Sequence, residues 1–573
     1  MRVKLTVLLT LSLAMSCAVA QAAVVTSLLK TDDPAPGAPG NTIYGLNNTA
    51  TDGPSAYAVA FNSSGTAGTL SHVWGNLAGG AGVPLRMEAT YDTLEQTSFE
   101  SFFGIGADLP GMAYSAVCTH TVSGATGLDA VFRNDSVVTV EDAPYPHEPG
   151  YYWTFGSRAG MTAGGAPYWV GGITDSYGGS TTNRGLFYGL GATPLLLGGD
   201  SVPGVADPLS TSSTVSFDYR FSRHGAQYIA EVTTTAPSTA NHHMVLSGSG
   251  LQLDNQPVYE GWPVPASIGG LPSENWDNFD YCGITDDGTW FFSGDTDHST
   301  ALDEIVVYNG TIRYREGDTV DGETLTGAIE GAYLNEDGDL AMIWDIVGGT
   351  GSLEALFFDS QLIAVEGDAI DIDGDLIPDP GAVIENFSGI STLSLSDRDG
   401  NGNVAIYFTA DVEVTRGGRM PAPVERLPES LVARAADGLS AEDVAQVEAD
   451  PRGESRLSVE CFCRVIVSVP PASAENEPLR GADSHLTVVP SIVAESQSQI
   501  HFRLAAPRQM AVTIYDLAGR SVRTIAAGSF AAGPQSLVWD GRDAVGTPVP
   551  AGVYLVRLDG DPTAAAQRVT VLR

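Results

Sequence analysis

Two acidic runs in this chain have the residue types and spacing of calcium-binding loops. The first run spans residues 371–379. Calcium takes about six to eight hard oxygen ligands, which closely spaced carboxylates in a turn can supply. The run differs from an EF-hand loop, because Leu376 stands where glycine is usual and Ala382 where a bidentate carboxylate is usual. We therefore weigh a calcium loop against an acidic surface turn. The candidate ligands are Asp371, Asp373, Asp375 and Asp379.

The second run spans residues 397–403 and offers both carboxylate and amide oxygens. Gly402 stands where the chain is expected to turn. Other units have a turn at this position without such a cluster, for example Thr285–Gly288, so a plain hairpin tip is the alternative to a calcium site. The candidate ligands are Asp397, Asp399, Asn401 and Asn403.

Catalytic groups are harder to identify from the sequence. The motifs of serine hydrolases, zinc peptidases and phosphate-binding loops do not occur. Carboxylates are abundant, and spacing alone cannot show which of them converge into an acid–base pair. His242 and His243, or Asp297 with His298, could join a site, but histidines in surface loops are the more economical explanation. We therefore assign no catalytic residue.

The elements that would position these loops form an internal repeat. An apolar strand, a turn with an acidic residue and then glycine or proline recur most clearly at Tyr314–Gly322 and Ala364–Asp371. The acidic positions recur roughly every 50 to 62 residues, near the upper end of the periods of propeller blades. Weaker copies lie at Leu28–Gly37, Val138–Pro144, Leu196–Gly204 and Val258–Pro265.

Each repeat is long enough for about four short strands. A glycine turn leads into an aromatic-rich strand, as at Gly338–Trp344, and a tight hairpin follows, as at Asn309-Gly310. About seven such units predict an all-β, seven-bladed-like β-propeller over residues 23–415, with a repeated β-sandwich array as the alternative. The last unit stops after Val404–Phe408, so the early strand Val24–Leu29 is expected to complete it and close the ring.

The repeat resembles bacterial secreted proteins with EGD-type tandem motifs. The motif is carried here by Glu316-Gly317-Asp318 and Glu366-Gly367-Asp368, and the resemblance covers roughly Val24 to Val414. Proteins of this kind often have tails that anchor them to the cell envelope, and their functions are mostly unknown. The resemblance therefore implies an exported propeller-like scaffold and names no ligand.

Residues 416–483 form a different segment, rich in proline, alanine and acidic residues. We predict a linker with a small insert, in which Arg456–Val469 is a strand pair or one long strand. Ser440–Val447 has the pattern of a short helix with Ser440 as its N-cap.

Alternating strands and glycine turns return in residues 484–573 and predict one small Ig-like sandwich. Three motifs occur there in order, at Tyr515–Arg520, Trp539–Asp543 and Pro550–Tyr554. With these motifs the tail resembles the Ig-like domain of the flagellar hook-cap protein and the related sorting domains of type IX secretion substrates. The resemblance implies a partner in the secretion or cell-envelope attachment machinery. A plain spacer domain is the alternative.

The first 22 residues predict export. Arg2 and Lys4 precede an apolar run that ends at Ala18-Val-Ala20, the pattern of a cleaved signal peptide. Lipid attachment at Cys17 is the rival, although the preceding residues lack the usual leucine. No later run reaches about 18 apolar residues, so the mature chain is expected to have no membrane span.

The net charge of −41 argues against a nucleic-acid partner, since phosphate binding needs basic patches. Four cysteines remain after signal removal, and three pairings between them stay open.

Together these features predict a secreted or cell-surface binding or structural protein, with calcium as its possible cofactor and a glycan or a protein as its ligand. The alternative is an extracellular polysaccharide hydrolase or lyase built on the propeller.

Overall fold

In the residues that it describes, the computed structural model contains strands and one short 3-10 helix, η1 (Ala266–Ile268). The predicted signal peptide and the predicted helix at 440–447 lie outside the residues that it describes. Within those residues, no helix is long and apolar enough to cross a membrane. The described residues are 23–51, 56–77, 81–88, 91–92, 97–108, 111–120, 125–212, 218–348, 351–387, 392–416, 455–469, 486–489, 492–493, 498–504, 508–516, 520–530, 533–550, 552–559 and 567–571.

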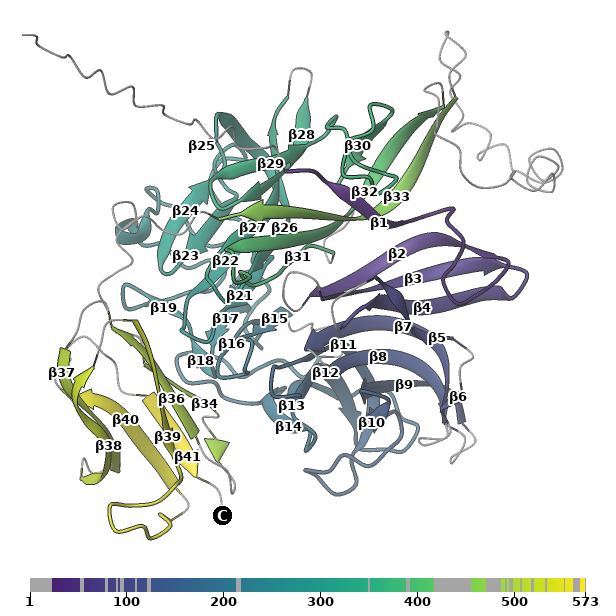
Figure 1. Cartoon of the computed structure of the whole chain (residues 1–573). Coiled ribbons are helices and arrows are strands. Elements are labelled where there is room, and N and C mark those ends of the chain that lie inside the picture. The colour runs from purple at the N-terminus through teal and green to yellow at the C-terminus, as the bar shows by residue number, and fades with distance from the viewer. Residues whose placement is uncertain are drawn as a thin grey trace, which may run out of the picture.

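The described residues up to 469 form seven main antiparallel sheets, here called blades 1 to 7 (Figure 1). Blade 1 contains β2 (Asn41–Thr51), β3 (Tyr57–Gly65), β4 (Gly68–Asn76) and β5 (Val83–Met87). Blade 2 contains β6 (Tyr91–Asp92), β7 (Thr97–Asp108), β8 (Gly111–His120), β9 (Ala125–Arg133) and β10 (Ser136–Val140). Blade 3 contains β11 (Tyr152–Met161), β12 (Pro167–Thr174), β13 (Asn183–Tyr188) and β14 (Thr193–Leu197).

Blades 4 to 6 follow in the same chain order. Blade 4 contains β15 (Asp218–Phe221), β16 (Tyr228–Thr233), β17 (His242–Leu246) and β18 (Ser249–Gly250), and the small hairpin of β19 (Gln252–Leu253) and β20 (Gln256–Pro257) follows it. Blade 5 contains β21 (Cys282–Ile284), β22 (Trp290–Gly294), β23 (Ile305–Tyr308) and β24 (Thr311–Arg315). Blade 6 contains β25 (Thr319–Val320), β26 (Glu323–Leu334), β27 (Leu340–Val347), β28 (Ser352–Phe358) and β29 (Gln361–Val365).

Blade 7 joins the two ends of the repeat domain. It contains β30 (Ala382–Asn386), β31 (Ser394–Leu395), β32 (Asn403–Arg416), β33 (Ser455–Ser468) and β1 (Thr26–Lys30). The expectation that the first strand joins the last sheet is confirmed, but β1 pairs with β33 and not with β32 (Figure 1). The missing strand, β33, comes from within the segment 416–483, and it pairs with β32 along its whole length.

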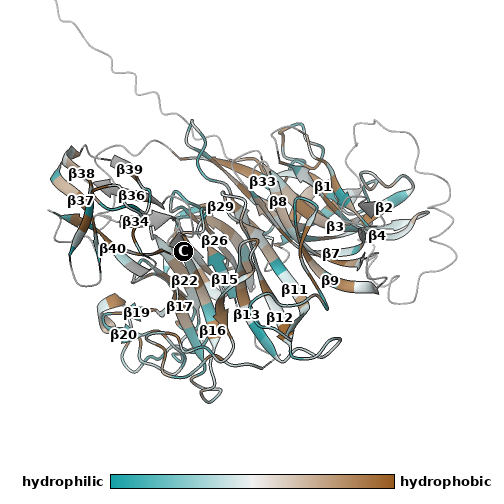
Figure 2. Cartoon of the chain, turned by 90° about the horizontal axis from the view of Figure 1, so that it is seen from below, coloured by the Kyte–Doolittle hydropathy of each residue, from teal (hydrophilic) through white to brown (hydrophobic). Residues whose placement is uncertain are grey.

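The strands are apolar on both faces because each blade packs between two others. On β27, Ala341 and Ile343 belong to a hydrophobic cluster with blade 7, and Met342 and Trp344 belong to one with blade 5. Successive side chains of a strand point to opposite faces, so a strand buried on both sides is a continuous apolar run. The hydrophobic colour of Figure 2 accordingly follows the strands.

Seven hydrophobic clusters lie between successive blades of the described repeat domain. The cluster between blades 7 and 1 closes the ring, with Phe61 on one side and Tyr407 and Phe462 on the other. A strand of every blade also lines one central cavity: β2, β7, β11, β15, β21, β26 and β31. This is the arrangement of a β-propeller, and it confirms the predicted fold class.

The C-terminal residues form a separate sandwich of two sheets. One contains β34 (Leu486–Val489), β36 (Ser498–Leu504) and β39 (Gly533–Trp539). The other contains β35 (Ile492–Val493), β41 (Gln567–Val571), β40 (Gly552–Asp559), β37 (Arg508–Asp516) and β38 (Ser521–Phe530). Trp539 is fully buried between the sheets, and its Nε1 donates a hydrogen bond to the carbonyl of Arg542 at 2.9 Å.

Candidate functional site

The inner strands of the repeat domain surround a central channel with a volume of about 560 Å³. Its wall differs from one side to the other. On blades 2 and 3 the inner strands are rich in glycine, and a Cβ atom on Gly106 would lie 2.4 Å from the Cα atom of Gly160. Blades 4 to 7 present most of the tyrosines and charged groups of the lining, whereas blades 2 and 3 contribute Asp108, Arg158 and Tyr168.

Arg220, on the inner strand β15, lines the middle of this wall. Among the described residues, its guanidinium has no carboxylate partner and no hydrogen bond, and it lies 5.7 Å from the centre of the Tyr333 ring. Tyr168 and Tyr219 also line the channel, and burial raises the pKa of Tyr168 to about 12. The Tyr168 hydroxyl is therefore a neutral donor at physiological pH. An arginine in this setting can form a charge-assisted, two-pronged hydrogen bond with an anion.

A network of ionic groups crosses the channel where the inner strands end. The Arg223 side chain of blade 4 forms an ion pair with Asp397 of blade 7. The Glu336 carboxylate of blade 6 accepts hydrogen bonds from the main-chain amides of Arg223 at 2.5 Å and Asp286 at 2.7 Å. Asp397 accepts another from the amide of Glu336 at 2.9 Å. These carboxylates therefore hold different blades together.

The same network shifts the pKa values of its carboxyl groups in opposite directions. Burial, followed by the negative charges of Asp286 and Asp397, raises the pKa of Glu336 well above its usual value. Burial also opposes ionisation of Asp286, but the hydrogen bonds from His224 hold its pKa below the usual value. Each acidic group here has a partner that explains it structurally, so the network alone is weak evidence for catalysis.

The opposite end of the channel is acidic. Asp218 forms an ion pair with Arg158, and Glu231 forms one with His242. The side-chain hydrogen bond with Glu231 raises the pKa of His242 and favours its charged form. Asp280 lines the cavity beside these groups. The sequence suggested a surface-loop histidine at position 242, whereas His242 is the first residue of β17, the third strand of blade 4.

The structure gathers three of the four candidate ligands of the first acidic loop. Oxygens of Asp371, Asp373 and Asp375 lie within 4.8 Å of one another. Asp371 is fully buried, while Asp373 and Asp375 are exposed. Asp379 points to the main chain and accepts the amide of Ile372 at 3.0 Å. The Asp371 carboxylate itself accepts the amides of Gly374, Asp375 and Leu376.

The second acidic loop is divided between two places. Asp397 faces the channel, where Arg223 and the amide of Glu336 engage its oxygens. Asp399 accepts hydrogen bonds within its own turn from the amides of Asn401 and Asn403, both at 2.8 Å. Sequence spacing suggested one ligand set, but the strand geometry turns Asp397 away from that turn. Calcium binding by the remaining residues stays a prediction.

The repeated Gly-Asp motif has a structural explanation. Asp200, Asp318 and Asp368 each accept a hydrogen bond from the main-chain amide three residues earlier, at 2.9, 2.8 and 3.0 Å. Gly317 and Gly367 have φ angles of 87° and 90°, where a side chain would be strained. The motif therefore shapes the turn that follows the last strand of a blade.

The structure also shows the state of the cysteines and the role of the motifs in the C-terminal domain. The four cysteines of the described residues are free and buried, so none of the three possible pairings occurs.

In the C-terminal domain, Asp516 forms an ion pair with Arg520, and the Tyr554 hydroxyl donates to the carbonyl of Pro550 at 2.9 Å. The motifs that carried the resemblance of the tail thus stabilise its turns.

Comparison with known proteins identifies only the C-terminal part. Residues 489–562 match the family model of the FlgD Ig-like domain. No curated protein matches the chain. Among solved structures, PorZ of Porphyromonas gingivalis, described as a surface component of the type-IX secretion system, is 11% identical with a TM-score of 0.21, over 94% of this chain and 83% of that chain.

Two enzyme structures are similarly distant. The gluconolactonase XC5397 of Xanthomonas campestris is 9% identical with a TM-score of 0.22, over 59% of this chain and 95% of that chain. The polysaccharide lyase Uly1 is 9% identical with a TM-score of 0.24, over 79% of this chain and 90% of that chain. TM-scores this low carry no argument about function. The comparisons therefore establish one point: the chain has a FlgD Ig-like domain near its C-terminus.

Proposed function

We propose that this chain is an exported, cell-surface-attached binding protein whose central channel holds the acid group of a glycan. The observation that carries the proposal is Arg220, whose guanidinium lines the cavity without a carboxylate partner among the described residues. Arginine binds carboxylates through paired hydrogen bonds, and tyrosine rings offer flat faces and hydroxyls to sugar rings. A cavity of about 560 Å³ is within the usual range of ligand pockets.

The acidic end of the channel is compatible with this ligand. Carboxylates such as Asp218 and Asp280 accept hydrogen bonds, and sugar hydroxyls are good donors. A glycan with many hydroxyls and one acid group would thus meet acceptors at the mouth and Arg220 further in. Neutral sugars lack the group that Arg220 binds, so the proposal predicts selectivity for uronic acids and similar sugars.

Binding can be measured by titrating the full chain with acidic oligosaccharides, for example oligogalacturonate, and with neutral oligosaccharides of the same length. We expect acidic ligands alone to bind, and the affinity to fall as salt is added. Arg220→Gln should weaken binding at least tenfold, since it removes a charge-assisted interaction. Arg557→Gln, at an exposed arginine of the C-terminal domain, is the control and should leave affinity unchanged.

Binding that Arg220→Gln leaves intact, or an absence of binding to every acidic glycan, would reject the proposal. The alternative function, a polysaccharide hydrolase or lyase, has its own readout in the same mixtures. Release of reducing ends or of unsaturated sugar products over time would show turnover and favour the enzyme.

The FlgD Ig-like domain supports the attachment part of the proposal. The predicted signal peptide at 1–22 would direct export, and the C-terminal domain would then meet the secretion or envelope machinery. A chain truncated after residue 483 should be exported but released into the medium, whereas the full chain should stay with the cells. Equal retention of both chains would show that the domain is only a spacer.

We further propose that the loop 371–379 binds calcium. The support is the close approach of the Asp371, Asp373 and Asp375 oxygens, of which two residues are exposed to solvent. Because Asp371 also accepts three main-chain amides, it has a structural role that does not depend on the ion. Variants at Asp371 and Asp375 separate the two roles, since only the first carries those hydrogen bonds.

A further inference from the structure

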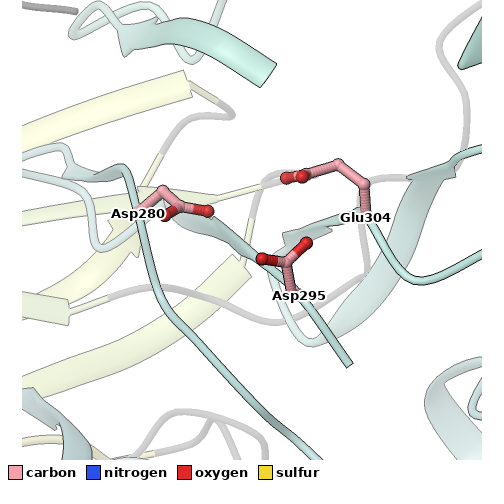
Figure 3. A group of neighbouring side chains, drawn as sticks. All are labelled: Asp280, Asp295 and Glu304. Atoms are coloured by element: carbon pink, nitrogen blue, oxygen red, sulfur yellow. The ribbon is translucent and has the colours of Figure 1, made fainter. Parts of the chain in front are cut away.

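Three carboxylates of blade 5 converge at the acidic end of the channel. Asp280 precedes β21, Asp295 follows β22 and Glu304 precedes β23, so adjacent antiparallel strands bring them to one edge of the sheet. Their oxygens lie within 4.8 Å of one another, and Figure 3 shows the three side chains pointing toward a common centre. Gly294 pairs with Ile305, which places Asp295 opposite Glu304 in the same register.

The burial of Glu304 makes this cluster different from an exposed acidic turn. The residue is 6% exposed, and its Oε1 atom is buried without a hydrogen-bond partner in the described structure. A buried carboxylate oxygen without a partner costs free energy, and like charges directly opposite each other on two strands are destabilising. Glu304 is aimed at the two aspartates nonetheless (Figure 3).

The surroundings increase the negative charge. Asp295 and Asp280 each place a carboxylate oxygen within 4.8 Å of an oxygen of Glu304. Asp218 lines the channel at the same end as Asp280, and Glu231 lies opposite Asp218 on the next strand of blade 4. Two cationic side chains at this end of the channel have partners of their own, because His242 pairs with Glu231 and Arg158 with Asp218. The centre of the cluster is therefore a place for positive charge.

We infer that Asp280, Asp295 and Glu304 bind a divalent metal cation of the hard, oxygen-preferring class. Such ions take carboxylate ligands, and an ion here would satisfy the unpartnered Oε1 of Glu304 and remove the repulsion between the strands. The side-chain amide of Asn278 donates to Asp280 at 2.8 Å and holds this carboxylate in place. Asp280 lines the channel, so the ion would reach solvent through it.

This site is separate from the loop at 371–379, which belongs to blade 7, and it does not depend on the glycan proposal. A metal site and a cluster that is stabilised by shared protons alone predict different effects of added calcium. Protons would make the carboxyl groups neutral, and added calcium would then leave the stability of the chain unchanged. An ion instead replaces the protons and links three strands of blade 5.

The experiment uses the full chain after treatment with a chelator and its removal. Calcium, magnesium and manganese chlorides are titrated separately by calorimetry, and thermal unfolding is recorded with and without each metal. The same measurements are made on a chain carrying Asp373→Asn and Asp375→Asn, in which the blade 7 loop is impaired. We expect this chain to retain one metal-binding event and a rise in its unfolding temperature.

Glu304→Gln, made in the same background, should weaken that event at least tenfold and abolish the rise. Asp277→Asn is the matched control, since Asp277 is an exposed neighbour outside the cluster, and it should leave binding within about twofold. If Glu304→Gln fails to fold, Asp280→Asn tests the same ligand set at an exposed position. Binding of none of the three metals, or metal binding that is undiminished in the Glu304 or Asp280 variant, would overturn the inference.

Discussion

The guanidinium of Arg223 forms an ion pair with the carboxylate of Asp397, which lies 174 residues later in the chain. The pair joins blade 4 to blade 7, although blades 5 and 6 lie between them in the sequence. The main-chain amide of Arg223 also donates to Glu336 of blade 6. Arg223 is therefore the positive centre that holds the acidic groups at this end of the channel.

Replacing Arg223 should destabilise the propeller more than replacing its partner. Arg223→Gln leaves Asp397 beside Glu336 without a cation, and we expect it to lower the free energy of unfolding by about 1–2 kcal/mol. Asp397→Asn should cost less, because an amide still accepts the hydrogen bond from Glu336. Chemical denaturation of the two variants and of the double variant checks this. A double variant whose loss equals the sum of the single losses would show that the pair contributes nothing.

The buried His72 side chain should lower the free energy of unfolding in mild acid. It is 1% exposed, and burial lowers its pKa from 6.5 to about 4. Between these pH values the unfolded chain binds a proton that the folded chain does not, so the free energy of unfolding falls as the pH falls from 6.5 to 4. The loss is at most about 3 kcal/mol, and it is complete near the lower value.

Denaturation curves recorded across this pH range test the effect. His72→Gln should flatten the pH dependence, although it also alters the hydrogen bond to Ser63. His147, an exposed histidine, provides the control, and His147→Gln should leave the pH dependence as in the natural chain. An unchanged slope in the His72 variant would contradict the assignment.

Truncating the chain before or after β33 tests whether blade 7 needs this strand. A chain ending at residue 416 lacks β33, so β1 loses its partner and β32 keeps only β30 and β31 on its other side. The long unpaired edge of β32 should promote aggregation. A chain ending at residue 469 keeps blade 7 and should be soluble, with one cooperative unfolding transition. Size-exclusion chromatography and calorimetry of the two chains distinguish the outcomes. A monomeric, cooperatively folded 1–416 chain would show that blade 7 does not need β33.

The acidic loop of blade 7 allows its structural and metal-binding roles to be separated. Asp371→Ala removes the acceptor of three main-chain amides, and we expect a loss of about 2–3 kcal/mol with or without calcium. Asp375→Asn keeps those hydrogen bonds, so it should cost little without calcium and abolish stabilisation by calcium at this loop. The measurement is denaturation in chelator and in calcium, with Glu304→Gln in all chains to isolate the loop. Calcium stabilisation that survives in the Asp375 variant would argue against this site.

Much of the architecture follows from the local pattern of residues. Apolar runs such as Leu340–Trp344, with glycine turns on either side, indicate strands buried on both faces, because side chains alternate between two neighbouring sheets. The Gly-Asp turns mark where a blade ends, and the motifs around Trp539 are enough to indicate the Ig-like domain. These features can be predicted because each depends on contacts within a few residues.

The remaining features depend on which distant strands meet. β33 lies beyond a linker, so its place between β1 and β32 is set by pairing at long range. Spacing placed Asp397 with Asp399, but the ring of blades turns it to Arg223. Likewise, Asp280, Asp295 and Glu304 have no motif in the sequence, and only the register of β22 and β23 brings them together. Local sequence thus determined the strands and turns, whereas closure of the ring decided which charged groups face one another.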